Sequence, residues 1–358
     1  MTVLVSGTGL IGTSVALALR AKGTDVWLSD RDEATAQLAA DLGAGTVVPD
    51  LRDAKGIADI AVLAMPPAAV AAALALGQEH GVADVHTDVA SVKGLPVRQA
   101  RELGCDLSSY VPGHPLAGRE RHGPAAARAD LFLGRTWALC PLPETSPAAV
   151  QAVTALVLAC GADPVTTDPE THDQWVALVS HVPHLVAAAM AARLAPSVVP
   201  ADALRLAGQG LRDVTRIAAG DSALWTQILS ANAGPVAEVL AAVAVDLSAA
   251  ACALGVSAET PADVTDLLER GQAGVARIPG KHGGQPRNFT VVQVVIPDQP
   301  GELARLFDAA GAAGVNIEDV RIEHSPGLPV GVAELSVRPD QAAALLDAME
   351  AGGWPVRR

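Results

Sequence analysis

Cysteine is scarce in this chain of 358 residues. The four cysteines are far apart in the sequence, and none of them forms a CxxC pair. This spacing argues against a zinc site and against a disulfide framework. We therefore expect no metal site and a protein of the reducing cytoplasm.

The sequence also lacks an uninterrupted apolar run of the roughly 20 residues that a membrane span needs. One long apolar stretch is broken by Asp59, and another by Glu238 and Asp246. Only two residues precede the first apolar run at the N-terminus, so the basic segment of a secretory signal is absent. The sequence predicts neither a membrane partner nor an export signal.

The chain has fewer basic than acidic residues, which gives a formal net charge of −14, and its Lys and Arg residues do not cluster in a basic stripe. Nucleic-acid binding needs clustered Lys and Arg, so we expect no nucleic-acid partner. Aromatic residues make up only 3% of the chain, but half of all residues are hydrophobic, which is enough for sizeable cores. The length predicts two or three domains.

A glycine motif near the N-terminus is the first feature that indicates a function. Residues 7–12 read GTGLIG and lie between a predicted strand at 3–6 and a predicted helix at 13–22. In such a GxGxxG the glycines allow a tight turn, close approach of a pyrophosphate, and close packing of helix on strand. A lone motif of this kind can be a turn that binds nothing, so its surroundings decide.

The surroundings favour a dinucleotide site. A second predicted strand ends at Asp30, which lies 18 residues beyond Gly12, where a carboxylate binds the ribose hydroxyls of NAD. The neighbouring arginine could instead hold a 2′-phosphate, so NADP stays possible although NAD is favoured. The predicted cofactor-binding residues are Gly7, Gly9, Leu10, Ile11, Gly12, Asp30 and Arg31.

Further strands alternate with helices in the rhythm of a doubly wound α/β sheet. We expect strands at 60–64, 85–89 and 136–140, and a last helix at 147–160. The sequence therefore predicts a Rossmann dinucleotide-binding domain over residues 1–165.

Two loops after these strands carry polar side chains. Ser91 stands in the loop DVASVKG, where a serine commonly caps the following helix. His114 stands in GHPLAGRE, where glycine and proline hold it in a stiff, non-helical segment. An imidazole with a pKa near neutrality can give or take a proton, although a lone loop histidine is more often merely exposed.

From about residue 171 the pattern becomes helical. Ser180, His181 and His184 lie within one turn of each other, and a zinc site is disfavoured because no third or fourth ligand is evident. Further along, Arg212 and Arg216 share a helix face, so either could hold a carboxylate. Packed histidines and a solvated helix edge are the simpler interpretations.

Five segments taken together resemble the prephenate/arogenate dehydrogenase family of tyrosine biosynthesis. They read GTGLIGTS, DVASVKG, GHPLAGRE, SHVPH and RDVTRIA, in this order, with Trp225 downstream. The resemblance covers residues 1–284 and implies a Rossmann domain followed by an all-helical substrate and dimerisation domain at 166–284. It implies a homodimer and the NAD-dependent oxidative decarboxylation of prephenate to 4-hydroxyphenylpyruvate, with arogenate as the alternative substrate.

The resemblance also implies roles for single residues. His114 would accept the proton of the ring 4-hydroxyl, and Ser91 would share that hydrogen bond. Arg216 would bind a substrate carboxylate. The side chain of the substrate would be contacted by His184, Ser180 and His181, and a polar gate would be formed by Asp213 and Glu120.

The tail after the polar linker at 281–287 predicts a small α+β (ferredoxin-like) domain at 288–358. Its elements follow the order βαββαβ. The segments IPDQPGELARLF and GVNIEDVRI resemble an ACT domain, the amino-acid-sensing module of many biosynthetic enzymes. The resemblance implies tyrosine or phenylalanine as effector; a domain that only dimerises is the alternative.

Two other functions stay open at this point. One is a catalytically inactive dinucleotide sensor whose tail transmits an amino-acid signal. The other is a β-hydroxyacid dehydrogenase, but these enzymes rely on a lysine in the helical domain, and residues 170–280 contain none.

Overall fold

The computed structural model describes residues 1–48, 52, 54–118, 122–256, 262–278, 289–324 and 329–357. The chain divides into two compact units, Met1–Val245 and Asp246–Arg358. Glu120 and the predicted linker at 281–287 lie outside the described residues.

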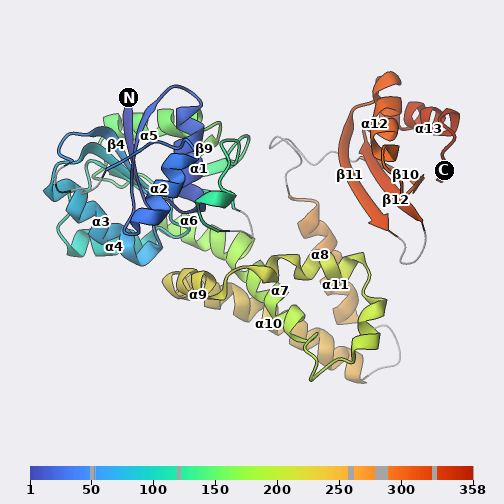
Figure 1. Cartoon of the computed structure of the whole chain (residues 1–358). Helices are drawn as coiled ribbons and strands as arrows, with labels where there is room; N and C mark the ends of the chain where they lie inside the picture. Colours follow the sequence, from blue (N-terminus) through green and yellow to red (C-terminus); the bar gives the residue numbers. More distant parts are fainter. Residues whose placement is uncertain are drawn as a thin grey trace. The chain divides into compact units, whose positions relative to one another are not determined.

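A six-stranded parallel sheet forms the centre of the first unit (Figure 1). Its order is β3-β2-β1-β4-β5-β6, which is that of a doubly wound dinucleotide-binding fold. The strands are β1 Thr2–Ser6, β2 Asp25–Ser29, β3 Thr46–Val47, β4 Ala58–Leu63, β5 Ala83–Asp88 and β6 Tyr110–Val111. The prediction of a Rossmann domain is thus confirmed.

Side chains of β1 alternate between two buried faces, as the period of a strand requires. Val3 and Val5 belong to the hydrophobic core that also holds α1 and α5, whereas Leu4 packs in a cluster on the other face. The helices of this domain are α1 Leu10–Arg20, α2 Glu33–Asp41, α3 Pro67–Glu79, α4 Gly94–Glu102 and α5 Pro147–Ala159. Because both faces are covered, ligands have access mainly at the carboxyl edge of the strands.

Helix α1 starts earlier than predicted, at Leu10 rather than Thr13. Gly9 is the N-cap residue, and the Thr13 amide donates to the Gly9 carbonyl over 3.0 Å. The last glycine of the motif therefore lies inside the first helical turn, where α1 packs against the loop.

The predicted strand at 136–140 was assigned to the wrong sheet. It is β8 (Thr136–Leu139), the middle strand of a separate three-stranded sheet with β7 (Gly113–Pro115) and β9 (Asp163–Thr166). The strand β7 pairs antiparallel with β8, so the chain reverses direction after β6 instead of adding to the parallel sheet. Helix α5 lies where a helix was predicted at 147–160, and the strand β9 follows it.

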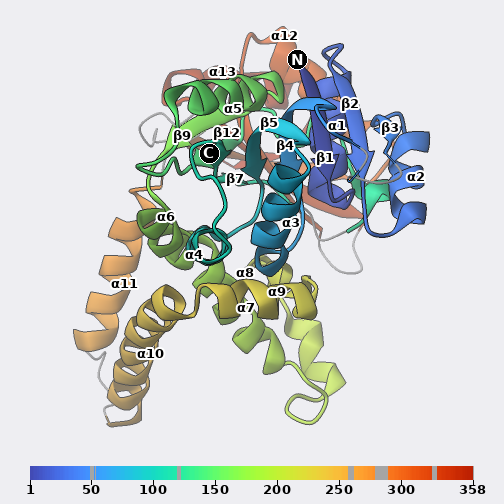
Figure 2. The same cartoon turned by 90° about the vertical axis from the view of Figure 1, so that its left-hand side faces the viewer.

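Helices dominate the rest of the first unit, as predicted (Figure 2). A π-helical turn at Ala177–His181 joins α6 to α7, and a small core forms around Ala177, Val182 and Val236. The helices are α6 Pro169–Val176, α7 Val182–Ala192, α8 Gln209–Thr215, α9 Ser222–Ala231 and α10 Ala233–Val256. The unit boundary falls within α10.

Two helical stretches, Pro169–Ala192 and Ala233–Gly255, are long and apolar enough to cross a membrane by length and composition alone. Glu238 and Asp246, which interrupt the apolar run in the sequence, lie within the continuous helix α10. A core helix passes the same test, and the first stretch contains the buried His172 and Asp173. The second stretch differs, because only 6% of its apolar window is buried in the single chain.

The second unit contains α11 (Ala262–Val275) and a small antiparallel sheet of order β11-β12-β10-β13. Two helices, α12 and α13, pack on this sheet around Leu306 and Leu345. The elements are β10 Thr290–Pro297, α12 Glu302–Ala312, β11 Ile317–His324, β12 Val330–Val337, α13 Ala342–Ala351 and β13 Val356–Arg357. The predicted order βαββαβ is confirmed.

Replacing Gly12 by alanine should destabilise the fold. A Cβ at this position would lie 1.9 Å from the Gly7 carbonyl oxygen, so the loop or the helix must shift. We expect the free energy of unfolding in a denaturant titration to fall by about 2 kcal/mol, although alanine is the better helix former. The control is Gly9→Ala, because a Cβ there meets nothing within 4 Å, and its effect should stay within about 0.5 kcal/mol. Equal effects of the two substitutions would contradict this account.

Candidate active site

The glycine motif follows β1 at the carboxyl edge of the parallel sheet. Gly7 has a φ of +97°, and a Cβ there would lie 2.4 Å from the Ala64 carbonyl oxygen, so glycine is required. The surroundings of Gly9 are open, which allows a pyrophosphate to approach the backbone at the start of α1. Leu10 and Ile11 form the first turn of that helix. These residues fit a dinucleotide.

Asp30 follows β2 at the same edge and turns its carboxylate toward the motif. Its Oδ2 accepts hydrogen bonds from the Thr8 amide (2.6 Å) and the Thr8 hydroxyl (3.0 Å). The side chain stays partly exposed, and Arg31 beside it is exposed. A carboxylate at this edge could bind ribose hydroxyls, and that role of Asp30 stays a prediction.

A fully buried ion pair lies at the end of β5. The Lys93 ammonium contacts the Asp88 carboxylate and donates to the Gly113 carbonyl, and the Tyr110 hydroxyl donates to Asp88 over 2.6 Å. Burial first, and the negative charge of Asp88 next, raise the pKa of Tyr110 well above its usual value. These contacts tie β5, β6 and β7 together directly beside His114.

Sequence reasoning quoted the loop that contains Asp88 and Lys93 but singled out only Ser91. Ser91 is partly exposed in a bend of this loop. The interpretation of Ser91 as a helix cap was wrong, because Lys93 is the N-cap residue of α4 and the amides of Lys93 and Gly94 donate to the Asp173 carboxylate instead. The role of Ser91 beside His114 stays a prediction.

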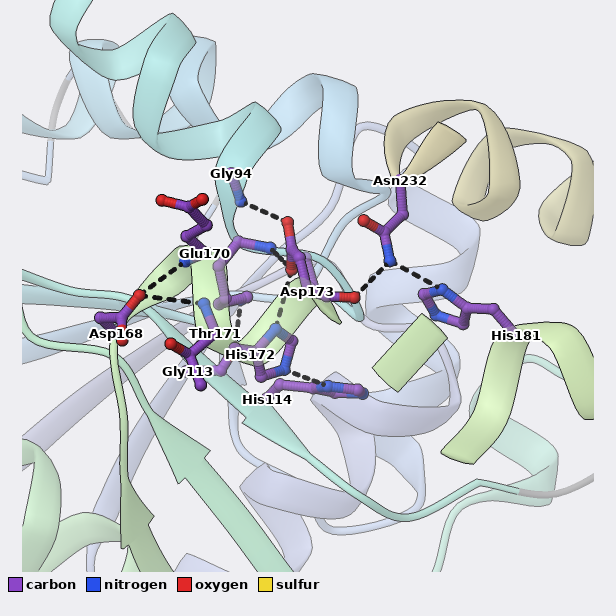
Figure 3. Close-up of polar contacts among 12 residues, drawn as sticks. Gly94, Gly113, His114, Asp168, Glu170, Thr171, His172, Asp173, His181 and Asn232 are labelled. Carbon is purple, nitrogen blue, oxygen red and sulfur yellow. Dashed lines mark hydrogen bonds and ion pairs between the residues drawn. The ribbon is translucent and has the colours of Figure 1, made fainter. Parts of the chain in front are cut away.

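His114 lies on β7, at one end of a chain of hydrogen bonds (Figure 3). Its Nδ1 lies 3.0 Å from Nε2 of His172, and Nδ1 of His172 lies 2.8 Å from Oδ1 of Asp173. Burial is the main cause that lowers the pKa of His114 well below 6.5, followed by the nearby His172, Lys93 and His181. His114 is therefore a neutral imidazole at physiological pH.

The Asp173 carboxylate holds the start of α4 as well. It accepts hydrogen bonds from the backbone amides of Lys93 and Gly94, each over 2.8 Å. Sequence reasoning missed both His172 and Asp173. The available signal was a histidine next to an aspartate, just after a helix start at Asp168, whose carboxylate caps α6.

Asn232 fixes the ring of His181, which is buried. The Asn232 Nδ2 donates to the Asp173 carbonyl (2.8 Å) and to Nδ1 of His181 (3.1 Å). Only the amide nitrogen can face a carbonyl oxygen, so the orientation of this amide is determined. Burial lowers the pKa of His181 to about 4, and the neutral ring then carries its proton on Nε2.

His184 stacks on Trp225, with ring centroids 3.6 Å apart and an angle of 13° between the planes. His181 meets the same indole edge-on at 6.2 Å. Gly220 completes the cluster, because a Cβ there would lie 2.6 Å from Nε1 of Trp225. The structure thus brings two of the predicted site histidines together around one tryptophan, and Ser180 lies beside them on the π-helical turn.

The predicted arginine lies just beyond α8. Arg216 begins a short 3-10 helix, Arg216–Ala219, which packs on the His184 helix α7, and its side chain is exposed. Asp213 is also exposed and accepts a hydrogen bond from Gln209 within α8 (2.9 Å). The roles of both residues stay predictions, and Glu120, the other residue of the predicted gate, lies outside the described residues.

Comparison with known proteins identifies the family. The model of the prephenate dehydrogenase nucleotide-binding domain matches residues 15–166, and that of the prephenate dehydrogenase dimerization domain matches residues 168–261. The chain belongs to the prephenate dehydrogenase family. The predicted family, the Rossmann domain and the helical domain that follows it are thereby confirmed.

Individual relatives agree with this assignment. The Streptomyces niveus protein named probable prephenate dehydrogenase NovF is 40% identical, over 99% of both chains. The crystal structure of the Aquifex aeolicus prephenate dehydrogenase, in complex with hydroxyphenyl propionate and NAD+, is 26% identical with a TM-score of 0.68. It matches 78% of this chain and 98% of its own. The Synechocystis arogenate dehydrogenase is 27% identical, with a TM-score of 0.64 over 77% of this chain and 99% of its own.

Two buried histidines should make the fold sensitive to acid. The pKa of His181 and that of His86, on β5, are both lowered from 6.5 to about 4 by burial. Between these pH values the unfolded chain binds protons that the folded chain does not, so the free energy of unfolding falls as the pH drops from 6.5 toward 4. Within that window each histidine lowers the free energy of unfolding by about 1.4 kcal/mol for each unit by which the pH drops.

Denaturant titrations at a series of pH values test this expectation. The matched variant is His86→Phe, which removes one titrating ring from β5 while keeping an aromatic side chain. Between pH 4 and 6.5 we expect the free energy of unfolding of this variant to depend less steeply on pH, by the amount that corresponds to about one proton fewer taken up on unfolding. A slope identical to that of the wild type would show that His86 does not titrate as proposed.

Proposed function

We propose that this protein is an NAD-dependent prephenate dehydrogenase, which converts prephenate to 4-hydroxyphenylpyruvate by oxidative decarboxylation. The observation that carries the proposal is the neutral imidazole of His114, held through Nδ1 by His172 at the carboxyl edge of a dinucleotide-binding sheet. Membership of the family and the 40% identical relative support the reaction class.

The proposed chemistry needs a proton acceptor beside the substrate ring. NAD, when bound, would supply the acceptor for the hydride of C4. His114 accepts the proton of the 4-hydroxyl through Nε2, and Ser91 shares the hydrogen bond to that hydroxyl. The ring carboxylate then leaves as carbon dioxide, and the electron pair of the broken C–C bond enters the ring, which becomes aromatic and places negative charge on the ring oxygen. That oxygen takes the proton back from His114 to give the product hydroxyl, and the gain of aromaticity drives the step.

The cofactor site would use the residues predicted from the sequence. The backbone at Gly7, Gly9 and the first turn of α1 would hold the pyrophosphate. The Asp30 carboxylate would bind the ribose hydroxyls, and its hydrogen bonds to Thr8 support this placement. Arg31 keeps NADP possible as a second cofactor.

Binding of the substrate side chain would fall to the helical domain. Arg216 would bind a carboxylate, while His184, Ser180 and His181 would contact the pyruvyl group. The likeness to the Synechocystis arogenate dehydrogenase keeps arogenate as the second candidate substrate. Asp213 and Glu120 would form the polar gate.

The proposal also covers the oligomeric state of the protein and the role of its C-terminal domain. We propose a cytoplasmic homodimer, in which a second copy covers the exposed apolar surface of α10, and the match to a dimerization domain supports it. We also propose that residues 288–358 form an ACT-like domain that binds tyrosine or phenylalanine, with the βαββαβ order as support. Three domains, at 1–165, 166–284 and 288–358, would follow.

One assay tests the function. NADH or NADPH formation is followed with prephenate or with arogenate, with each cofactor, and with and without tyrosine or phenylalanine. We expect turnover with prephenate and NAD. Turnover with arogenate alone would assign the second candidate, and no turnover with either substrate would favour the redox-inactive sensor.

Replacing His114 by asparagine should remove the proton acceptor while conserving a polar side chain. We expect kcat to fall by about 10² or more, since general-base catalysis contributes on that scale. The affinity for NAD, measured by calorimetry, should be nearly unchanged. Near-normal turnover would remove His114 from the mechanism.

Replacing Arg216 by alanine should chiefly raise KM for prephenate. The contact to a side-chain carboxylate exists in the ground state and in the transition state alike, so its loss weakens binding more than it slows the chemistry. Steady-state kinetics separates the two effects, and Arg212→Ala is the matched control one helical turn away. An unchanged KM in the Arg216 variant, with a raised KM in the control, would move the contact to Arg212.

A further inference from the structure

We propose that His172 and Asp173 are positioning residues that determine which nitrogen of His114 carries the proton. The three side chains form one hydrogen-bonded chain, Asp173 to His172 to His114 (Figure 3). The inference rests on the proposed function of His114 as a proton acceptor and adds how the protein prepares it for that role.

The carboxylate end of the chain is rigidly held. Asp173 is 6% exposed, and its two oxygens accept from the backbone amides of Lys93 and Gly94 as well as facing His172. The backbone amides are donors only, so these oxygens act as acceptors. The carbonyl of Asp173 is held in turn by the Asn232 amide.

This arrangement fixes the proton on each ring. Nδ1 of His172 faces an accepting oxygen and must donate, so in the neutral ring its Nε2 is an acceptor. That acceptor lies 3.0 Å from Nδ1 of His114, which therefore carries the proton. The lone pair of His114 is left on Nε2, the nitrogen that has to accept the substrate proton.

The same chain can take up the charge that the reaction creates. As the O–H bond of the substrate breaks, a new N–H bond forms on Nε2 of His114. The proton on Nδ1 of His114 then passes to Nε2 of His172. The positive charge ends on His172, against the Asp173 carboxylate, and no other reactant is needed.

The other charged groups around His114 fit this assignment. The Lys93 ammonium, which precedes α4, disfavours a positive charge on His114, but it is paired with Asp88 of β5. His181 of the π-helical turn is a neutral ring. Of the described groups that act on His114, His172 is the one hydrogen-bonded to its ring and backed by a carboxylate.

Nitrogen NMR of histidine-labelled protein without substrate tests the proton positions directly. In the wild type we expect the His114 ring, assigned through the His114→Asn variant, to show protonated Nδ1 and unprotonated Nε2. The Asp173→Asn variant offers one acceptor oxygen to three donors, so a share of His114 should move to protonated Nε2. Protonated Nε2 on His114 in the wild type would overturn the proposal, whether or not prephenate is the substrate.

Kinetics of the Asp173→Asn variant gives a second, independent readout. We expect kcat to fall by about 10² or more with little change in KM, because a share of the enzyme holds the wrong tautomer and the carboxylate that faces the positive charge on His172 is lost. The control is Asp168→Asn. The Asp168 carboxylate caps α6 by accepting from the amides of Glu170 and Thr171 and makes no contact with the His172 ring, so kcat of this variant should stay close to that of the wild type.

The pH profile separates positioning from simple loosening of the site. Loss of the Asp173 charge disfavours protonation of the histidine pair, so the acid limb of kcat/KM should move to lower pH. A loosened site would admit water and move the limb up, toward 6.5, because burial is the main cause of the lowered pKa of His114. An upward shift, or a folded variant with unchanged kcat, would overturn the proposal.

Discussion

The carboxylate of Asp173 is the contact on which the arrangement of this site depends. It belongs to the first helix of the helical half, yet it accepts the backbone amides of Lys93 and Gly94 at the start of α4 in the dinucleotide-binding half. A carboxylate at a helix N-terminus is favoured by the helix dipole as well as by the hydrogen bonds. Because its Oδ1 also faces His172, one side chain joins the two halves and ends the hydrogen-bonded chain to His114.

The second constraint on the site is that its buried titratable side chains are either neutral or paired with an opposite charge. The histidines at 114 and 181 are kept neutral mainly by burial, whereas the one buried ammonium, Lys93, among the described residues is neutralised by Asp88. Removing one partner of such a pair leaves a buried charge uncompensated, at a cost of several kcal/mol. The pair therefore holds the Gly113 carbonyl, next to His114, and contributes little net charge to the site.

Local sequence patterns predicted most of the helices and strands, but they did not predict which distant segments lie in contact. The GTGLIG motif with Asp30 predicted the dinucleotide half, because its signals lie within one βαβ unit, and the tail was predicted in the correct element order for the same reason. The strand at 136–140 was predicted as a strand but with the wrong partners, since a strand pattern does not say which strand lies beside it. His172 and His114 are 58 positions apart, so only the folded chain shows that they meet.

The charge balance finally limits where an anionic substrate can be recognised. The chain carries a formal net charge of −14, and the Lys93 ammonium is already paired, so neither the overall field nor the buried cation attracts a dicarboxylate. Exposed guanidinium groups on α8 and the following 3-10 helix are the cations beside the histidine cluster, because that helix packs on α7. An arginine keeps its charge and its forked geometry at any pH the enzyme meets. In the proposed function, anion binding and proton transfer are thus assigned to different side chains, so that His114 would stay neutral while an arginine holds the substrate by charge.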